Sequence, residues 1–382
     1  MQRLAEELEL ARELIRAESP SGRESPAAEV LLETLRELKY DQVYLDDAGN
    51  AIGMIRRGDG PTVMFNGHMD TVPAGDPGIW THQPFAGTIA DGRLWGRGSC
   101  DMKAALACMA IAGRDAADRG FSGTLVVAAV VQEEVGGLGA RHLVEHLPAD
   151  VVVLGEPSDL ELKLGHRGRV EISVRLPGRI AHAAKASLGA NALYRAARYL
   201  RNLEECALPS GGPLGASTAT PTGIVIFPGG ANVVPGEAEI TVDYRTIVED
   251  EPEMVVARLE TLDPEAVVVV GQEDAMSENG KIRFSFPRIN PAYLAPQGAP
   301  EVDVARSAIR AALSELDRPF REGVWWFATD APFLASRGAP VIGFGPGEPE
   351  RAHTTEEGVP VEHLAVARSV YERLALAYLG AA

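Results

Sequence analysis

Cysteine is scarce in this chain of 382 residues, which contains only Cys100, Cys108 and Cys206. None of them forms a C-x-x-C pair, and this pattern favours a protein of the reducing cytoplasm. No run of about 18 apolar residues occurs, so a transmembrane helix is not expected. The amino-terminal stretch is rich in acids and lacks the basic and then apolar layout of a signal peptide. We therefore expect a cytoplasmic protein without a membrane partner.

Positive charge is also in deficit. Lys and Arg number 36 against 54 Asp and Glu, which gives a formal net charge of −18. Nucleic acid and anionic membranes require a basic surface, so neither is an expected partner. The length suits two domains, or one large domain with an insertion.

Two enzyme signatures are missing as well. The chain has no G-x-S-x-G nucleophile elbow, which argues against a serine hydrolase. The segment GGLGARH lacks the third glycine and the later acid of a dinucleotide-binding fingerprint.

What the chain does contain is a series of nearly continuous apolar runs, which alternate with segments of helical spacing. The runs lie at 62–65, 124–131, 151–154 and 340–344. Helical spacing predicts helices over 4–17, 24–38, 102–119 and 361–379, with Asp101 as the N-cap of the third. This alternation is typical of a parallel sheet that is covered on both faces.

The middle of the chain differs, because 170–175 and 237–245 alternate polar and apolar residues as half-exposed strands do. Two helical patterns lie among them, at 191–203 and 253–262. We therefore predict an α/β fold. A mostly parallel-sheet catalytic domain of residues 1–166 and 289–382 would be covered by helices. Residues 167–288 would form an inserted α+β lid or dimerisation domain.

Ionisable residues follow the apolar runs where a sheet edge is expected. His68 and Asp70 follow the first run, Glu133 and Glu134 the second, Glu156 the third, and His353 the fourth after a short loop, while Asp101 lies in a glycine-rich turn. In an open parallel sheet, the carboxyl ends of the strands share one edge where ligands bind.

Such a group of carboxylates would repel one another without a cation, and imidazole with carboxylate oxygen suits zinc, with manganese or cobalt as substitutes. We expect His68 to be a ligand and Asp70 to orient its ring from the other nitrogen.

Each of these residues taken alone has an ordinary explanation. Glu133 and Glu134 could be a solvated strand end, Asp101 a simple helix cap, and His353 a loop histidine. Only their joint placement at consecutive strand ends indicates a metal site. His82, His142, His146 and His363 have no such placement and are expected to be surface or capping residues.

A series of blocks across roughly residues 65–357 resembles the co-catalytic zinc hydrolases. That family includes acetylornithine deacetylase, succinyl-diaminopimelate desuccinylase, aminoacylase and carboxypeptidase G. The blocks are NGHMDTVP, GRGSCDMKAALACM, VVQEEVGG, LGEPSDL, GHRGRVEISV, GRIAHAAKASLGANAL, PGGANVVPGEAEITVDYR, FATDAPFL and FGPGEPERAHTTEE. Glu156 in the third carboxylate block resembles the deacylase side of the family, and acetylornithine deacetylase is closest in motif.

The resemblance implies two Zn²⁺ per chain, with Co²⁺ or Mn²⁺ as substitutes. One ion would be held by His68 and Glu156 and the other by Glu134 and His353, with Asp101 bridging the two. Glu133 would be the general base, taking a proton from a metal-bridging water and delivering it to the leaving amine.

The inserted domain matches the family too. His182 corresponds to a residue that reaches across a homodimer to stabilise the oxyanion. Asn232 and Arg245 correspond to positions that contact the intermediate and the substrate carboxylate. Without the resemblance, an arginine such as Arg245 on an alternating strand would usually face solvent.

The expected function is cleavage of the acyl-amide bond of an N-acyl-L-amino acid in amino-acid metabolism, with a short peptide as another possible substrate. A metallo-dipeptidase or carboxypeptidase of the same fold, or a succinyl-diaminopimelate desuccinylase, remains an alternative. A non-enzymatic protein on this fold would have lost Glu133 or a ligand, and neither is lost.

The block aligned with TDAPFL carries Pro332 where desuccinylases have an arginine. This departure predicts a small neutral acyl group, unless Arg337 or Arg351 replaces that arginine.

Overall fold

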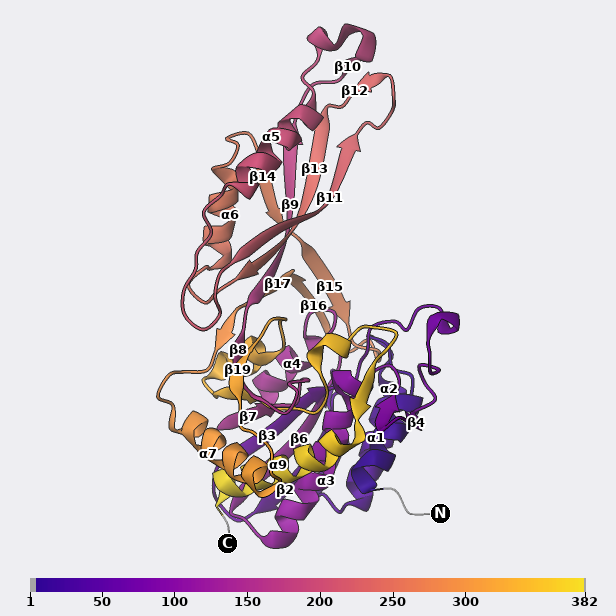
Figure 1. Ribbon diagram of the computed structural model, residues 1–382, viewed down its shortest axis with the longest axis vertical. Coiled ribbons are helices and arrows are strands. Elements are labelled where there is room, and N and C mark those ends of the chain that lie inside the picture. The colour runs from indigo at the N-terminus through magenta and orange to yellow at the C-terminus, as the bar shows by residue number, and fades with distance from the viewer. Residues whose placement is uncertain (1–4, 381–382) are drawn as a thin grey trace.

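Two hydrophobic cores divide the chain in the computed structural model, which describes residues 5–380 (Figure 1). The larger core belongs to a broad α/β domain that contains both ends of the described chain. The smaller core belongs to an elongated domain, here called the lid, which projects from the first. The predicted helix start at Leu4 lies outside the described residues.

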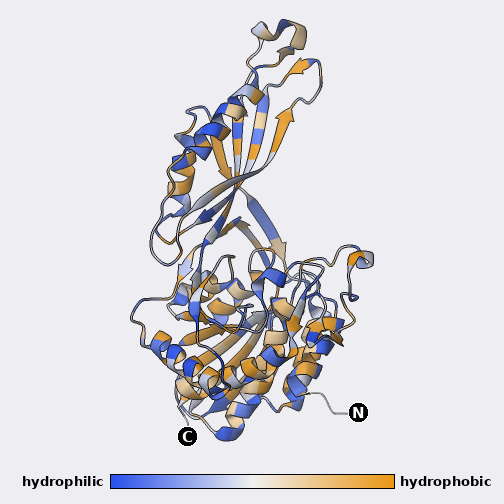
Figure 2. Cartoon of the chain, in the orientation of Figure 1, coloured by the Kyte–Doolittle hydropathy of each residue, from blue (hydrophilic) through white to orange (hydrophobic). Residues whose placement is uncertain are grey.

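The larger domain is built on a nine-stranded sheet in the order β1-β2-β6-β3-β7-β20-β8-β18, with β19 paired to β8. Strands β6, β3, β7 and β20 are parallel and form its centre. Their apolar residues are buried on both faces, which explains the nearly continuous apolar runs (Figure 2). The strands are β1 (Gln42–Leu45), β2 (Ala51–Arg57), β3 (Thr62–His68), β6 (Gly123–Val130), β7 (Val151–Leu154), β8 (Leu162–His166), β18 (Tyr293–Leu294), β19 (Glu322–Trp325) and β20 (Val341–Gly343).

Helices cover this sheet. One group packs α3 against both α1 and α9, with α7 next to α9, while α4 packs against α8. The helices are α1 (Glu6–Arg16), α2 (Ser25–Glu37), α3 (Ala104–Arg119), α4 (Leu138–His146), α7 (Pro300–Glu315), α8 (Ala331–Leu334) and α9 (Val361–Leu379). The predicted α/β class with a mostly parallel sheet is confirmed.

The prediction that Asp101 caps α3 is wrong. A π-helical turn, η2 (Ser99–Lys103), precedes α3, and Lys103 occupies the N-cap position. Asp101 has extended backbone angles (φ −120°, ψ 94°) in this turn. Its side chain therefore points to the sheet edge instead of to the first amides of the helix.

The lid consists of an antiparallel five-stranded sheet in the order β11-β13-β9-β14, with β17 paired to β9. Helices α5 and α6 pack on one face of it. A short pair of strands, β10 and β12, lies at the end of the lid that is remote from the larger domain. The elements are β9 (Gly168–Pro177), β10 (Ala181–His182), α5 (Ala192–Glu204), β11 (Thr218–Phe227), β12 (Val233–Val234), β13 (Glu237–Thr246), α6 (Pro252–Glu260), β14 (Val267–Val270) and β17 (Ile289–Asn290).

A two-stranded ribbon of β15 (Gln272–Met276) and β16 (Arg283–Pro287) lies between the two domains (Figure 1). Its inward side chains, Ala275 and Phe286, pack into the larger core. The Gln132 side-chain amide donates to the main-chain oxygen of Met276 (2.9 Å). Residues of the predicted insertion therefore pack partly in the smaller core and partly, through the ribbon, in the larger core. The domain boundaries at 166/167 and 288/289 stay a prediction.

The remaining strands form a small sheet of β4 (Thr88–Ala90), β5 (Arg93–Trp95) and β21 (Gly358–Pro360). Short 3-10 helices are η1 (Pro77–Ile79), η3 (Ala183–Leu188), η4 (Ala335–Arg337) and η5 (Pro349–Arg351). Among residues 5–380, no helix combines the length and apolar character that crossing a membrane requires.

The turn between α1 and α2 packs behind the carboxyl ends of β3 and β6. Glu24 in this turn is only 2% exposed, and its carboxylate accepts hydrogen bonds from the main-chain N–H groups of Gly22 (2.7 Å) and Gln132 (3.2 Å). Burial, and then the charge of Asp70, raise the pKa of Glu24 from 4.5 to about 7. The protonated carboxyl is therefore favoured in the folded state.

We expect Glu24→Gln to flatten the pH dependence of stability in metal-free protein. A raised folded-state pKa gives stability that is present below about pH 4.5 and is lost as the pH rises through 7. The free energy of unfolding of the parent protein should therefore fall between pH 5 and pH 8, by about 1–3 kcal/mol more than that of the variant. Denaturant titrations in chelator measure this difference. Glu29→Gln, at an exposed site of α2, should retain the parent profile; equal profiles for Glu24→Gln and the parent would contradict the assignment.

Candidate metal centre

Four parallel strands deliver ionisable side chains to one sheet edge. His68 ends β3, Glu133 and Glu134 follow β6, and Glu156 follows β7. His353 lies in the loop between β20 and β21, and Asp101 lies in η2. A cavity of about 400 Å³ between the larger domain and the lid is lined by Asp101, Glu133, Glu134, Glu156 and His353.

Asp101 is the central residue of the cluster, because each of its two carboxylate oxygens approaches a different histidine. Its Oδ1 lies 3.0 Å from Nε2 of His68, and its Oδ2 lies 3.3 Å from Nε2 of His353. Glu134 lies 2.9 Å from the same His353 nitrogen. Asp101 therefore joins two groups of potential ligands.

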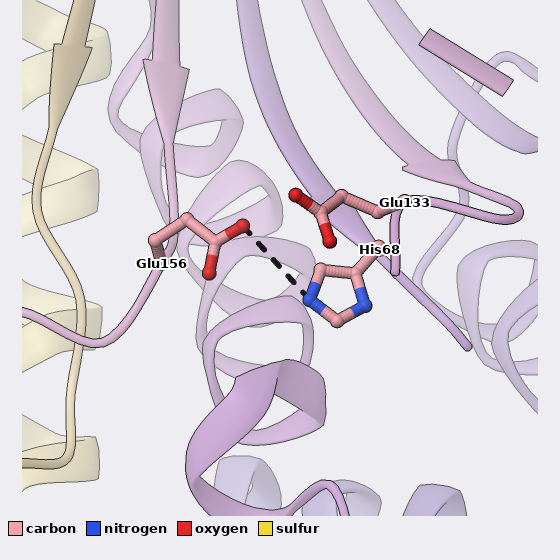
Figure 3. Close-up of side chains that lie close together, drawn as sticks. All are labelled: His68, Glu133 and Glu156. Carbon is pink, nitrogen blue, oxygen red and sulfur yellow. Dashed lines mark ion pairs between the residues drawn. The ribbon is translucent and has the colours of Figure 1, made fainter. Parts of the chain in front are cut away.

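Glu133 and Glu156 both lie next to the His68 ring (Figure 3). The Glu156 carboxylate is 3.9 Å from Nε2 of His68. Ligand atoms of His68, Glu133 and Glu156 lie within 4.8 Å of one another, as do those of His68, Asp101 and Glu134. Glu133 is thus close enough to act either as a ligand or as a base beside the ligands.

The charge balance of this cluster fits a divalent cation. Burial, together with the neighbouring carboxylates, raises the pKa of both Glu133 and Glu156. Hydrogen bonds to Asp101 and Glu134 raise the pKa of His353 to about 10. Without an ion, protonated histidines therefore supply the positive charge that the carboxylates need. A divalent ion that displaces those protons would supply the same positive charge, and the imidazole and carboxylate donors suit zinc, manganese or cobalt.

Asp70 contacts His68 at Nδ1, the ring nitrogen that faces away from Asp101. The Nδ1 atom of His68 lies 2.9 Å from the main-chain oxygen of Asp70 and 3.5 Å from its carboxylate. The carboxylate instead accepts hydrogen bonds from Ser21 Oγ (2.7 Å) and from the main-chain N–H groups of Glu133 (3.1 Å) and Glu134 (3.2 Å). Asp70 therefore fixes both the His68 ring and the loop that carries the two glutamates.

Sequence reasoning missed Glu357, which is 1% exposed and holds the Asp101 turn in place. Its carboxylate accepts from the main-chain N–H groups of Cys100 (3.1 Å) and Asp101 (3.2 Å) and pairs with Arg97. Glu357 and Arg97 are far apart in the sequence, and no local pattern links them. The only available signal was their position in blocks of the family resemblance.

Asp330 was missed as well, and it is buried beside the same edge with 1% exposure. Neither of its carboxylate oxygens has a hydrogen-bond partner in the described part of the chain. Burial, with a further contribution from Asp70, raises its pKa to about 7. Its only sequence signal was the block FATDAPFL.

One residue of the cluster and one residue next to it have left-handed backbone conformations, which residues other than glycine rarely adopt. They are Gln132 (φ 55°) and His353 (φ 63°). Each such residue costs about 1–3 kcal/mol, which the surrounding packing must offset. The loops after β6 and β20 are thereby bent so that Glu134 and His353 meet.

The three predicted residues of the inserted domain lie in two different places. Arg245 on β13 lines the cavity. His182 in β10 and Asn232 next to β12 lie at the remote end of the lid, where the main-chain oxygen of Asn232 accepts from Ala183 N–H (2.9 Å). Neither residue lines the cavity of its own chain.

Comparison with known proteins agrees with this architecture. Residues 64–377 match the model of peptidase family M20/M25/M40. The acetylornithine deacetylase of Myxococcus xanthus is 31% identical over 354 residues, covering 89% of this chain and 87% of the relative. The uncharacterized protein YgeY of Escherichia coli strain K12 is 28% identical over 385 residues, covering 96% and 93%.

Among solved structures, aminopeptidase PepT from Bacillus cereus superposes with a TM-score of 0.74 at 24% identity, covering 97% of this chain and 98% of that one. This likeness concerns the fold. The family match, the deacetylase relative and the cluster at the sheet edge lead to one conclusion: the chain belongs to peptidase family M20/M25/M40, whose members are metal-dependent hydrolases of amide bonds.

Proposed function

We propose that this protein is an amidohydrolase that cleaves the acyl-amide bond of an N-acyl-L-amino acid, as an acetylornithine deacetylase does. The observation that carries the proposal is the position of Asp101 between His68 and His353, beside an acid, Glu133, that is left out of these contacts. The similarity to the Myxococcus xanthus deacetylase supports the choice of substrate class.

In this proposal, His68 and Glu156 would hold one Zn²⁺, Glu134 and His353 would hold the other, and Asp101 would be a ligand of both. Co²⁺ or Mn²⁺ would serve in place of zinc. When bound, such ions polarise an amide carbonyl and lower the pKa of water towards about 7.

Glu133 acts as the general base. Its carboxylate makes no hydrogen bond within residues 5–380, whereas Glu134 is bonded to His353. Glu133 also lines the cavity, and burial raises its pKa. A carboxylate in this setting can accept the proton of the attacking water and then deliver it to the leaving amine.

Arg245 binds the α-carboxylate of the substrate. Its Nε and Nη2 atoms donate to Asp243 (2.7 and 3.3 Å), and its Nη1 makes no hydrogen bond within the described residues. That Nη1 group is available to a carboxylate in the cavity.

His182 and Asn232 act in the neighbouring subunit of a homodimer. Both lie at the remote end of the lid, so they cannot serve the cavity of their own chain in this arrangement. Strand β11 lies at the edge of the lid sheet and exposes Ile224, Val225 and Phe227. An exposed apolar edge strand is a surface that another chain can pair with.

The proposal also includes a location in the cytoplasm.

A metallo-dipeptidase or carboxypeptidase is the second candidate, because the fold also matches peptidases such as the Bacillus cereus aminopeptidase. A hydrolysis panel separates these functions. N-acetyl, N-formyl and N-succinyl amino acids should be compared with dipeptides, with Zn²⁺, Co²⁺ and Mn²⁺ each supplied.

We expect acetyl and formyl compounds to be cleaved at least about tenfold better in kcat/KM than succinyl compounds, a difference of about 1.4 kcal/mol. Pro332 offers no donor to a distal carboxylate. Arg337 pairs with Glu145, and neither Arg337 nor Arg351 lines the cavity. Preferred cleavage of dipeptides would reject the deacylase assignment, and preferred cleavage of the succinyl compound would reject the choice of acyl group.

Substitution of the two adjacent glutamates should separate turnover from metal binding. Glu133→Gln should leave metal content unchanged and lower kcat by about 10² or more, because the proton acceptor is lost. Glu134→Gln should lower metal occupancy, measured by elemental analysis after dialysis. Glu145→Gln, at an exposed site away from the cavity, should change neither quantity. Equal metal loss in Glu133→Gln and Glu134→Gln would show that the two roles are assigned wrongly.

Complementation tests the role of His182 across the dimer. Removal of one oxyanion donor costs about 10²–10³ in kcat, so His182→Ala and Glu133→Gln dimers should each be nearly inactive. A heterodimer of the two variants, purified through two different tags, has one site with both groups intact. Its activity should approach half that of the parent dimer. An inactive heterodimer of confirmed composition would contradict action in trans.

A further inference from the structure

The cavity beside the proposed metal centre has an apolar wall. Val135 follows the two glutamates, Phe286 comes from the ribbon, and Trp326, Phe327 and Phe333 come from the segment after β19. Trp326 is 57% exposed and Val135 is 38% exposed, although both are apolar. Apolar side chains that remain exposed in a cavity are available to bury part of a ligand.

This wall is held in place from behind. The Arg141 guanidinium lies over the rings of Phe286 (4.7 Å) and Phe333 (3.8 Å), and its Nε donates to the main-chain oxygen of Gly136 (3.0 Å). Gly136 has a φ of 114°, and a Cβ atom there would lie 2.4 Å from Phe286. The glycine therefore allows the loop of Glu133 and Glu134 to pack directly on the ring, so the wall and the loop are positioned together.

The charged residues on the lid side of the cavity compensate one another. Glu171 and Glu273 both pair with Arg288, the latter at 3.3 Å. Asp243 lies outside the cavity lining, but it pairs with Arg245 (2.7 Å) and Arg169 (2.9 Å), which are part of the lining. Burial raises the pKa of Asp243, but the hydrogen bonds from Arg245 and Arg169 outweigh that effect and lower it overall.

Every carboxylate that lines the cavity therefore has either an arginine partner or a place in the proposed metal centre. Glu171 and Glu273 have arginine partners, and Asp101, Glu133, Glu134 and Glu156 belong to the proposed metal centre. No lining carboxylate in the described part of the chain is left over for a cationic substrate side chain.

We propose that the amino-acid half of the substrate carries an uncharged, apolar side chain, which packs against Trp326, Phe327 and Phe286. This inference rests on the proposed deacylase function. It gives the substrate an apolar side chain in place of the charged side chain of ornithine, the amino acid for which the Myxococcus xanthus deacetylase is named. An aromatic or long aliphatic side chain would bury apolar area against the wall. An ornithine or lysine ammonium would lose hydration there without gaining an unpaired carboxylate.

Matched substrate pairs test this preference. N-acetyl-L-norvaline and N-acetyl-L-norleucine carry the carbon chains of ornithine and lysine without the terminal ammonium. We expect each neutral compound to exceed its charged counterpart at least tenfold in kcat/KM. Equal or better cleavage of N-acetyl-L-ornithine or N-acetyl-L-lysine would overturn the inference.

The same pairs with a glycyl group in place of acetyl separate the proposed deacylase function from the inferred preference for an apolar side chain. If only the glycyl compounds are cleaved, the deacylase function fails, and the comparison of neutral with charged side chains still decides the present inference.

Removal of the exposed indole gives a second test. Trp326→Ala should lower kcat/KM for N-acetyl-L-phenylalanine at least tenfold and change that for N-acetyl-L-alanine less than threefold, with unchanged metal content. Tyr44→Ala is a control, because Tyr44 is another exposed aromatic residue and lies on β1 outside the cavity. Tyr44→Ala should leave kcat/KM unchanged for both substrates. Equal losses for both substrates in Trp326→Ala would show that the indole does not contact the substrate side chain.

Discussion

The rest of the structure depends on the mutual repulsion of buried carboxylates at one sheet edge. Asp101 and Glu156 are at most 8% exposed and lie within reach of the same histidine. Several negative charges in such a place destabilise the fold unless positive charge is placed between them. The cluster is therefore stable only when protons on its histidines and carboxyls, or bound cations, offset the negative charge, and this requirement links the fold to its chemistry.

Much of the surrounding framework serves to hold that cluster together. Glu357 pairs with Arg97 and fixes the main chain on which Asp101 lies. Asp70 accepts hydrogen bonds from the main chain of both Glu133 and Glu134. Because these contacts go to main-chain groups, they set where each loop runs and leave the carboxylates of the cluster free to face the cavity. The contacts that oppose the repulsion of like charges are thus spread over several loops that follow the strands.

The division into two domains gives the cluster its second wall. The lid contributes Arg169 and Arg245 to a cavity whose floor comes from the larger domain. The ribbon of β15 and β16 packs into the larger core through Phe286, next to the loop of the two glutamates. The ribbon of the lid and the loop that carries Glu133 and Glu134 are therefore packed against each other. The remote end of the same lid, which carries His182 in β10, lies far from this cavity.

The sequence alone determined the α/β class, because the runs at 62–65, 124–131 and 151–154 are apolar on both faces, as only central strands can be. It also placed His68, Glu133, Glu134 and Glu156 at one edge, since parallel strands end on the same side. Only the tertiary structure decided how Asp101 is oriented, because the turn is held by Glu357 from more than 250 residues away. The same holds for the charge partners of Glu171 and Asp243 and for the wall around Trp326. Local patterns report periodicity and strand ends, whereas these contacts join segments whose proximity is set by the packing of the whole chain.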